Sequence, residues 1–496
     1  MKTKGKATPR KKATSSVKAR VQSLTASFSN DPIKHVVVLM LENRSFDHLL
    51  GCMKSVYPML EGNDRANPRV NFEGGRNYSQ KPIATRQLPP KVDPFHEAPD
   101  AMDQMNTNKP CGGFVHNFLN HYPSDIQDAQ EVMNYFDNKG ATRLPVLHTL
   151  AENFLICDHW FSSVRGPTWA NRFYVHSGTS LGRVFMPTGL FHNWHLYTQD
   201  TIYDRLNDAG VSWKIYHDGV PQSLVLTHQM EPQNAARYES IGDFFEDVKG
   251  AEADFPSYSF IEPAYFGSGQ NDQHPPSNVN NGEALIANVY NAIRANAALW
   301  NSTLLVVLYD ENGGFYDHVY PPAATPPDKL TDDGFTFDQY GFRVPALLIS
   351  PWVPRNFSSR IFDHTSLLRY VSDKWSLSSL TKRVDAANSI LPLLTTLSAP
   401  RTDTPAKIPA PALPKAAVAA VRTAFVTPTT ELNDLQKSLI TLTELLEQKT
   451  DDSAKAKTAR AAQLMVSQRD QIAVAHYRLD RFLEQQRRRA NIPTSK

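Results

Sequence analysis

Two apolar segments of the chain run without a break into clusters of acidic and amide side chains. The first, "HVVVLMLENRSFDH", starts at His35, and the second, "STLLVVLYDENGGFYDH", starts at Ser302. Apolar runs of this length are typical of buried strands. Polar groups at the end of such a strand are either solvated in a loop or used by a site, and carboxylate and amide oxygens are ligands for hard cations. One segment alone fits a capped loop, but two of the same design favour a metal site.

The segments belong to a longer alternation of strand and helix patterns. Strands separated by helices favour a mostly parallel sheet with helices on both faces, an α/β class of fold. Ligands of such sheets bind beyond the carboxyl ends of the strands, where both polar clusters fall. The predicted strands lie at 35–41, 153–158, 212–217, 302–310 and 344–350, and the clearest helical pattern lies at 282–300.

The composition is that of an ordinary globular protein, with 496 residues, 41% hydrophobic residues and a net charge of +2. Such a small charge gives no support to nucleic-acid binding. The chain has no apolar run long enough for a transmembrane helix and no readable signal peptide, which makes the cytoplasm the default location, with a secreted or peripheral membrane protein as alternatives. Three widely spaced cysteines, Cys52, Cys111 and Cys157, predict buried free thiols.

Composition and periodicity divide the chain into four parts. The start is basic and is expected to be disordered, with contact to anionic lipid as an alternative. Near the C-terminus, leucines spaced by three and four residues predict an amphipathic helix that packs on the main domain or on a second copy of the chain, with contact to a lipid surface as the lesser alternative. The leucines are Leu432, Leu435, Leu439, Leu442 and Leu446, and a second helical stretch covers 452–489. The parts are a basic tail (1–32), the main domain (33–398), a Pro/Ala-rich linker (399–428) and a helical C-terminal extension (429–496).

A hydroxyl and two histidines add candidates for chemistry. Thr168 follows Gly166 and Pro167 and precedes a predicted helix. A threonine at this position is often only the helix N-cap. A helix N-terminus also attracts phosphate, and a hydroxyl beside a metal is a stronger nucleophile. His96 and His274 lie in polar loops, where a histidine is either structural or placed to protonate or neutralise a phosphoryl oxygen.

Four of these segments, in the order found here, resemble one known family. "ENRSFDHLLG", "GPTWANR", "NDQHPPSNVNNGE" and "YDENGGFYDH" are similar to motifs of the phosphoesterase family of phosphatidylcholine-type phospholipases C and acid phosphatase A. That family belongs to the alkaline phosphatase superfamily. The resemblance covers 34–377, and "NRFYVHSGTS" is similar to the plant non-specific phospholipases C. It implies an alkaline-phosphatase-like α/β/α sandwich with a mostly parallel central sheet, to which the C-terminal helices are added.

The resemblance also implies roles for individual residues. One divalent cation is expected, and Ca²⁺, Mn²⁺ and Zn²⁺ are all compatible with the residues. The sequence departs from the family pattern at two places. Trp169-Ala170 replaces the His-Pro or Gln-Pro of many relatives, and Asn312 replaces a histidine and so cannot donate a proton as an acid. The expected metal ligands are Glu42, Asn43, Thr168, Asp310 and Glu311; the expected catalytic residues are Thr168, His274 and His96; the expected substrate-binding residues are Asn171, His318 and Asn312.

The expected activity is metal-dependent hydrolysis of phosphate esters through a phospho-threonine. The favoured prediction is a phospholipase C that acts on phosphatidylcholine-like lipids. The alternatives are an acid phosphatase for small monoesters, a sulfatase and a non-catalytic interaction protein. Expected partners are the phospholipid or small phosphate ester, a transient membrane surface and a second copy of the chain. Aromatic residues near the motifs either receive a lipid or choline group or belong to the core: Trp160, Phe161, Trp169, Tyr265 and Phe266.

Overall fold

The computed structural model describes residues 30–89, 92–106, 108–186, 197–267, 269–331, 333–413, 432–450 and 468–491. The predicted basic tail lies outside these ranges except for 30–32, as do 414–428 of the predicted linker and 452–467 of the second predicted C-terminal helix. The domain boundaries therefore stay predictions. All three cysteines are free and buried, as predicted. Within the ranges given, no helix has the length and apolar character needed to cross a membrane.

The centre of the molecule is an eight-stranded sheet in the order β11-β4-β10-β9-β1-β8-β6-β7. Its strands run parallel except β10, which is antiparallel to both β9 and β4. The predicted mostly parallel sheet is confirmed, and the five predicted strands form at the expected places, whereas β7, β8 and β11 were not predicted. The strands are β1 (His35–Leu41), β4 (Leu155–Cys157), β6 (Trp213–His217), β7 (Tyr238–Ser240), β8 (Tyr258–Glu262), β9 (Thr303–Tyr309), β10 (Ala346–Ile349) and β11 (Asn356–Ser358).

Strands β1 and β9 form the middle of the sheet, and every residue of both is buried. Their runs of Val and Leu suit a strand that is covered on both faces. The two strands pair in parallel from His35 opposite Thr303 to Leu41 opposite Tyr309. Both therefore end at the same edge of the sheet, and the residues that follow them are brought side by side.

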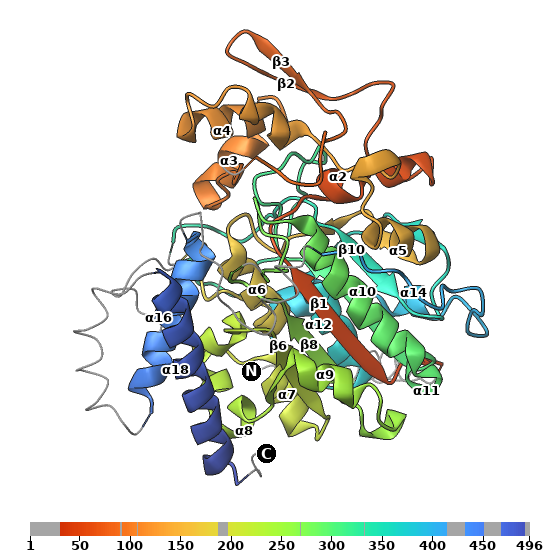
Figure 1. Ribbon diagram of the computed structural model, residues 1–496, viewed down its shortest axis with the longest axis vertical. Coiled ribbons are helices and arrows are strands. Elements are labelled where there is room, and N and C mark those ends of the chain that lie inside the picture. Colours follow the sequence, from red (N-terminus) through yellow and green to blue (C-terminus); the bar gives the residue numbers. More distant parts are fainter. Residues whose placement is uncertain are drawn as a thin grey trace, which may run out of the picture.

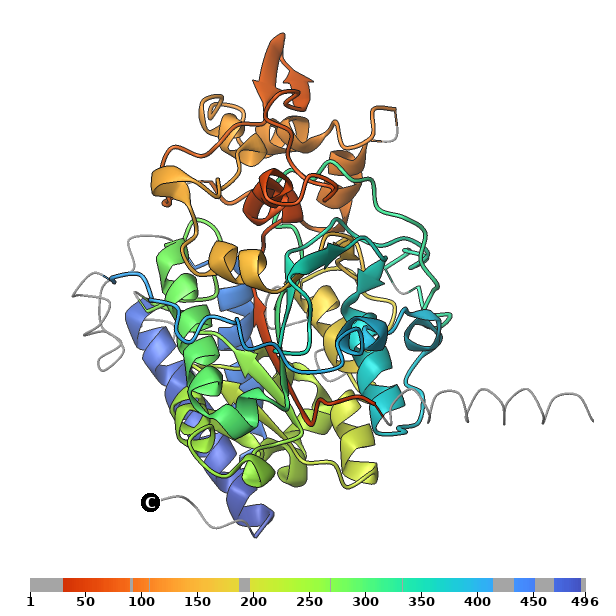
Figure 2. The ribbon, with the colours of Figure 1, turned by 90° about the vertical axis from the view of Figure 1, so that its right-hand side faces the viewer.

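Helices cover both faces of this sheet, which confirms the predicted sandwich. Helix α10 lies on one face, and α6 and α12 lie on the other (Figures 1 and 2). The main-domain helices are α2 (Phe46–Leu49), α3 (Ala98–Met105), α4 (Phe114–His121), α5 (Leu147–Asn153), α6 (Thr168–Ser177), α7 (Ile202–Asp208), α8 (Pro232–Ala235), α9 (Ile241–Asp247), α10 (Val279–Ala295), α11 (Ala297–Trp300), α12 (His364–Lys374), α13 (Lys382–Ala386) and α14 (Leu391–Leu394). The short 3-10 helices are η1 (Gly51–Ser55), η2 (Asp128–Met133), η3 (Gly140–Thr142), η5 (Gln222–Val225), η6 (Thr227–Met230) and η7 (Glu252–Asp254).

A smaller layer stands above the carboxyl edge of the sheet. It contains a hairpin of β2 (Val70–Glu73) and β3 (Arg76–Ser79) together with α3 and α4, and it forms the upper end of the molecule in Figure 1. Phe114, Phe118 and Met133 belong to a separate hydrophobic cluster that holds this layer together. The layer places the loop before α3 next to the ends of β1 and β9. A second small sheet pairs β5 (Trp160–Phe161) with β12 (Phe362–Asp363).

The C-terminal extension consists of α16 (Asp434–Gln448) and α18 (Gln468–Arg489), which lie side by side along the outside of the main domain (Figures 1 and 2). Asn433 caps α16, since its side-chain oxygen accepts a hydrogen bond from the Gln436 backbone at 2.8 Å. The Gln436 side chain in turn donates to the carbonyl of Tyr265 at 2.7 Å. The predicted leucine stripe is buried in the same hydrophobic cluster as the central sheet. It is therefore covered by the chain itself, which is the first of the three expected arrangements.

Shortening a leucine of this stripe should destabilise the protein. Leu439 is fully buried, so Leu439→Ala is expected to lower the free energy of unfolding by about 2–5 kcal/mol through lost burial and the cavity left behind. Gln448→Ala, at an exposed position of α16, is the control and should change it by less than about 0.5 kcal/mol. Denaturant unfolding of both variants measures the difference. Equal small effects would show that α16 is not part of the folded core.

Candidate active site

The polar residues that follow β1 and β9 meet at the edge of the sheet. The backbone N–H of Asn43 donates to Asp310 Oδ1 at 3.1 Å, and the backbone N–H of Arg44 donates to the carbonyl of Glu311 at 2.9 Å. Glu42, Asn43, Asp310 and Glu311 are all buried. Four of the five predicted metal ligands are thus adjacent, because the strands end in register.

Glycine is required where the two strand-end loops touch. A Cβ atom on Gly313 would lie 2.3 Å from the carbonyl oxygen of Asn43, and Gly313 has a φ of 59°. Asn43 itself has a φ of 53°, in the left-handed region that asparagine tolerates better than most residues. Gly313 therefore lets the two strand-end loops approach closely enough to bring their carboxylates together.

Thr168 points at this cluster from the start of α6. Its hydroxyl donates to Glu42 Oε2 at 3.1 Å and lies 3.4 Å from Asn43 Oδ1. The N-cap of the helix is Pro167, so Thr168 is the first helical residue. Its hydroxyl is used by the carboxylate and amide of the strand end and not for capping the helix.

Arg172 is the residue of the cluster that the sequence did not assign. It follows Thr168 by one turn of α6 and is fully buried. Its Nη2 forms an ion pair with Glu42 Oε1 at 2.5 Å, and its Nε donates to Asp310 Oδ2 at 3.1 Å. Burial raises the pKa of Glu42 above its ordinary value, and the guanidinium of Arg172 opposes that shift.

The two predicted catalytic histidines approach from separate loops. His96 Nε2 lies 3.1 Å from Asn43 Nδ2 and 3.6 Å from Glu311 Oε1. Burial disfavours its charged form, but the carboxylates of Glu311 and Asp93 outweigh burial and raise the pKa of His96 to about 9. Burial also raises the pKa of Glu311, to about 8. The ring centre of His274 is 6.4 Å from that of His96, and its Nδ1 lies 2.6 Å from the carbonyl of Pro275.

A cavity of about 680 Å³ opens onto these groups. Thr168, His96 and His274 lie on its wall, so the structure brings the three predicted catalytic residues together around one space. The first turn of α16, with the two residues before it (432–437), closes another side. The wall also contains carboxylates and aromatic rings, namely Asp93, Glu97, Asp434, Phe95 and Tyr122.

The aromatic residues singled out from the sequence do not line this cavity. All are at most 8% exposed and belong to the protein interior, which is the core alternative stated above. They are Trp160, Phe161, Trp169, Tyr265 and Phe266. The aromatic rings that do face the cavity, Phe95 and Tyr122, stand outside the recognised motifs. Phe95 immediately precedes His96, and Tyr122 follows the end of α4, so the sequence offers a signal only for Phe95.

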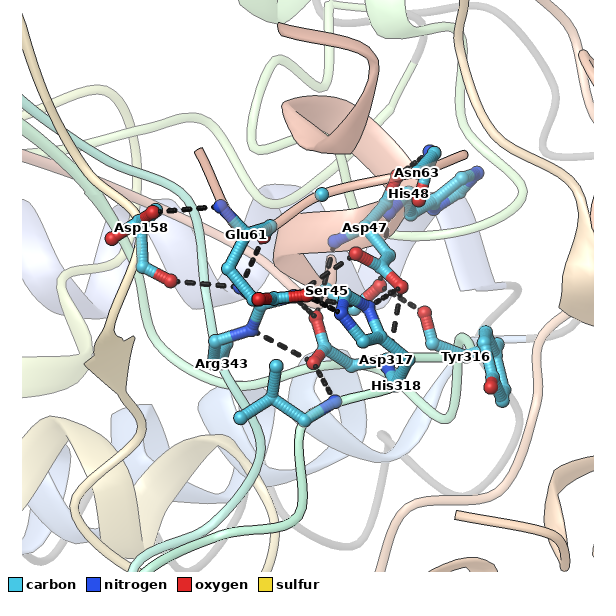
Figure 3. A network of polar contacts seen from close by, with 12 residues as sticks. Ser45, Asp47, His48, Glu61, Asn63, Asp158, Tyr316, Asp317, His318 and Arg343 are labelled. Carbon is cyan, nitrogen blue, oxygen red and sulfur yellow. Dashed lines mark hydrogen bonds and ion pairs between the residues drawn. The ribbon is translucent and has the colours of Figure 1, made fainter. Parts of the chain in front are cut away.

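A second polar network lies further along the same two strand-end loops (Figure 3). Arg343, in the segment leading into β10, is fully buried and contacts Asp47 Oδ1 at 3.0 Å and Asp317 Oδ1 at 2.9 Å. His318 joins the network through Asp47 and Glu61, each at 2.7 Å from one ring nitrogen. His318 and Arg343 outweigh burial and lower the pKa of Asp47 to about 2. The network ties the two loops to each other and to β10.

The three residues predicted to bind substrate have partners inside the protein. Both ring nitrogens of His318 contact the carboxylates of Figure 3. The Asn171 side chain bonds to the backbone of Val164 and Gly166 and so holds the loop before α6. Asn312 Nδ2 donates to the carbonyl of Phe315 at 3.3 Å. These contacts give each residue a role in shaping the loops, and direct contact with substrate stays a prediction.

Acidic and histidine side chains gather tightly at two other places. In the described part of the chain, Asp47, Asp317 and His318 form one group whose ligand atoms lie within 4.8 Å, and Asp200, Asp204 and His228 form another. The first already contains the cation of Arg343, and the second is at the surface. The predicted metal ligands include three carboxylates, Glu42, Asp310 and Glu311, but these are not a group of this kind among the described residues, so their oxygens do not all lie within 4.8 Å of one another.

Comparison with known proteins finds one matching family model and relatives named as phospholipases C. The model of the Phosphoesterase family matches residues 33–378. Non-specific phospholipase C6 of Arabidopsis thaliana is 34% identical over 412 residues, which are 76% of this chain and 75% of the relative. Phospholipase C B of Mycobacterium tuberculosis is 30% identical over 399 residues, which are 70% of this chain and 74% of the relative.

Similar solved structures are more distant. A protein of the alkaline phosphatase superfamily from Vibrio parahaemolyticus has a TM-score of 0.33 with 11% identity, covering 76% of this chain and 78% of that one. The lipoteichoic acid synthase LtaP from Listeria monocytogenes has a TM-score of 0.35 with 9% identity, covering 75% and 81%. Similarity at this level carries no argument about activity.

The α/β/α sandwich and the family match define an enzyme that hydrolyses phosphoester bonds. The chain belongs to the phosphoesterase family, as the four sequence motifs predicted.

Removing the cation of the second network should unfold the site. Arg343→Met leaves Asp47 and Asp317 buried without their shared partner, and we expect the free energy of unfolding to fall by about 3–5 kcal/mol. Lys329→Met removes an exposed charge and is expected to stay within about 0.5 kcal/mol of the wild type. Thermal and denaturant unfolding test both. A wild-type stability for Arg343→Met would show that the network does not hold the loops.

Proposed function

We propose that the protein is a metal-dependent phosphoesterase in which Thr168 is the nucleophile, and that it acts as a phospholipase C. The observation that carries this proposal is the position of the Thr168 hydroxyl. It lies on the wall of the cavity, donates to Glu42 and faces Asn43, with His96 and His274 on the same wall. A hydroxyl held by a carboxylate beside an open space is the arrangement that nucleophilic catalysis requires.

The residues present suit one divalent cation. Glu311 Oε1 is buried and accepts no hydrogen bond within the described residues, so this oxygen is available to a cation, whereas Glu42 Oε1 is already paired with Arg172 at 2.5 Å. We propose that Glu42, Asn43, Asp310, Glu311 and the Thr168 hydroxyl hold it, since hard cations bind carboxylate, amide and hydroxyl oxygens. Ca²⁺, Mn²⁺ and Zn²⁺ all remain compatible. When bound, the cation supplies positive charge that stabilises the alkoxide form of Thr168 and the phosphoryl oxygens.

The side chains of this site account for each proton in the reaction. The Thr168 hydroxyl gives its proton to Glu42 as its oxygen attacks phosphorus, and the bond from phosphorus to the leaving alcohol breaks. His96, whose raised pKa keeps it protonated near neutral pH, protonates the leaving oxygen. Water then attacks the phospho-threonine and gives a proton to His96, while Thr168 recovers its proton from Glu42. Positioning and charge supply most of the rate enhancement in such transfers.

The lining of the cavity favours a diester whose alcohol carries a positive charge. Three carboxylates and one lysine, Lys437, lie on the wall around Phe95 and Tyr122. Glu97 Oε2 and Asp93 Oδ1 are buried and accept no hydrogen bond within the described residues. Carboxylates and aromatic faces attract an ammonium group and repel the second negative charge of a phosphate monoester. This supports phosphatidylcholine-like lipids, which agrees with the names of the phospholipase C relatives.

The alternatives are weaker on the same observations. An acid phosphatase for small monoesters would place a dianion against the carboxylates of the cavity. A non-catalytic interaction protein would have no need of the buried hydroxyl and its carboxylate partner, both of which are present. Contact with a membrane surface and pairing of two chains through the C-terminal helices stay predictions.

Replacing the nucleophile should abolish turnover and preserve the fold. Thr168→Ala is expected to lower kcat by about 10³-fold or more, because no other hydroxyl is bonded to Glu42 in the described structure. Thr168→Ser keeps the hydroxyl and should retain part of the activity. Ser177→Ala removes a buried hydroxyl at the other end of α6 and serves as control. Normal turnover by Thr168→Ala would exclude Thr168 as nucleophile.

The substrate preference can be tested with two chromogenic esters. We expect a higher kcat/KM for p-nitrophenyl phosphorylcholine than for p-nitrophenyl phosphate. Glu97→Gln removes one carboxylate from the cavity and should lower kcat/KM for the choline ester by about tenfold, equivalent to about 1.4 kcal/mol. Asp103→Asn, on α3 but outside this cavity, should change neither substrate. Preference for the monoester, unaffected by Glu97→Gln, would favour the acid phosphatase alternative.

A further inference from the structure

We propose that Gln436 is a positioning residue through which the C-terminal helix α16 holds the loop that carries His274. This loop, called the His274 loop below, consists of residues 264–267 and 269–274 and lies between the end of β8 and the start of α10. The catalytic part of the inference rests on the proposed function, because His274 is one of the expected catalytic residues. Gln436 itself lies at the far end of the chain and outside every recognised motif.

The side-chain amide of Gln436 is shared between the start of α16 and the His274 loop. Its Oε1 accepts the backbone N–H of Asn433 at 3.1 Å, which is one half of the capping box of the helix. Its Nε2 donates to the carbonyl of Tyr265 at 2.7 Å and to Gln270 Oε1 at 3.4 Å. Gln436 is only 8% exposed, so these hydrogen bonds lie in the interior, where a donor left without a partner is costly.

A second amide extends this contact to the histidine. Gln270 Nε2 donates to both carboxylate oxygens of Asp272, each at 3.0 Å. Asp272 Oδ1 also accepts the backbone N–H of His274 at 3.0 Å. One chain of hydrogen bonds therefore runs from α16 through Gln270 and Asp272 to His274.

The groups at the two ends of this chain fix the direction of both amides. An ionised carboxylate only accepts hydrogen bonds, so Gln270 turns its Nε2 to Asp272 and its Oε1 to Gln436. A backbone N–H only donates, so Gln436 turns its Oε1 to Asn433 and its Nε2 to the loop. Glutamine therefore has a function here that glutamate lacks, because glutamate keeps the acceptor that caps the helix and loses the donor that reaches the loop.

Two contacts from the main domain also hold the loop, and both reach its backbone. The Asn281 side chain, from α10, donates to the carbonyl of Gln270 at 2.9 Å. The backbone N–H of Glu42 donates to the carbonyl of Asp272 at 2.8 Å. Loss of the contact from α16 should therefore loosen the loop and leave the main domain folded.

The first experiment measures amide hydrogen exchange in the His274 loop of the Gln436→Glu variant. Gln448→Glu makes the same chemical change at an exposed position near the end of α16 and is the control. We expect exchange in the loop to be about fivefold faster in Gln436→Glu than in the wild type, because one of its holding contacts is lost. Exchange in β1, and in the loop of Gln448→Glu, should not change. Wild-type exchange in the loop of Gln436→Glu would overturn the proposal.

The second experiment measures turnover of p-nitrophenyl phosphorylcholine with and without His274. With His274 present, Gln436→Glu should lower kcat by about fivefold, because a displaced histidine reaches the phosphoryl oxygen less well. In a His274→Ala background, the same change should alter kcat by less than about twofold, since the residue that Gln436 positions is gone. An equal loss in both backgrounds would show that Gln436 acts on the substrate or on α16 alone, and would overturn the proposal.

A second pair of variants decides if Gln436→Glu does not fold. Gln436→Met then replaces it, with Asn433→Ala as the control. Asn433→Ala removes the other half of the capping box and keeps the contact with the His274 loop. Faster exchange of the loop in Gln436→Met alone supports the proposal, and equal exchange in both variants overturns it.

The two experiments separate failure of this inference from failure of the proposed function. If His274→Ala has no measurable turnover, the exchange measurement decides the role of Gln436. A wild type that hydrolyses neither chromogenic ester would refute the proposed function, and hydrogen exchange would still decide whether α16 holds the His274 loop.

Discussion

The parallel, in-register pairing of β1 with β9 is the constraint on which the rest of the site depends. It brings Leu41 opposite Tyr309, so the acidic residues that follow both strands must share one buried place. Like charges in the interior repel each other and lose their hydration. The surrounding structure therefore has to supply positive charge and hydrogen-bond donors at this edge of the sheet.

Two arginines meet this requirement in the same way. Arg172 contacts Glu42 of the first strand-end loop and Asp310 of the second. Arg343 likewise contacts Asp47 of the first loop and Asp317 of the second. The two loops are thus joined by one guanidinium group near the strand ends and by a second one further along the loops. The first group adjoins the cavity and the Thr168 hydroxyl, and the second lies deeper along the loops and holds them in place.

The strands and the candidate nucleophile of the site can be predicted from the sequence, whereas the ion pairs that the site contains cannot. Strands β1 and β9 can be predicted because an apolar run that ends in acidic residues is a local pattern. Thr168 can be predicted because it lies in a recognisable motif. The ion pairs of Arg172 and Arg343 cannot be predicted, because the carboxylates that they contact lie far away in the chain and are brought to them only by the pairing of the strands. Trp160 and Trp169 show the limit of composition, since a large aromatic near a motif suits a core as well as a pocket.

The first turn of α16 forms part of the wall of the cavity although it belongs to the far end of the chain. A ribosome releases the chain from its N-terminus, so Thr168 and both strand ends emerge long before residues 432–437. Domains fold as they emerge, but this site lacks a wall until the C-terminal helix has docked. The order of synthesis therefore delays a complete substrate pocket until residues 432–437 have been made and have docked.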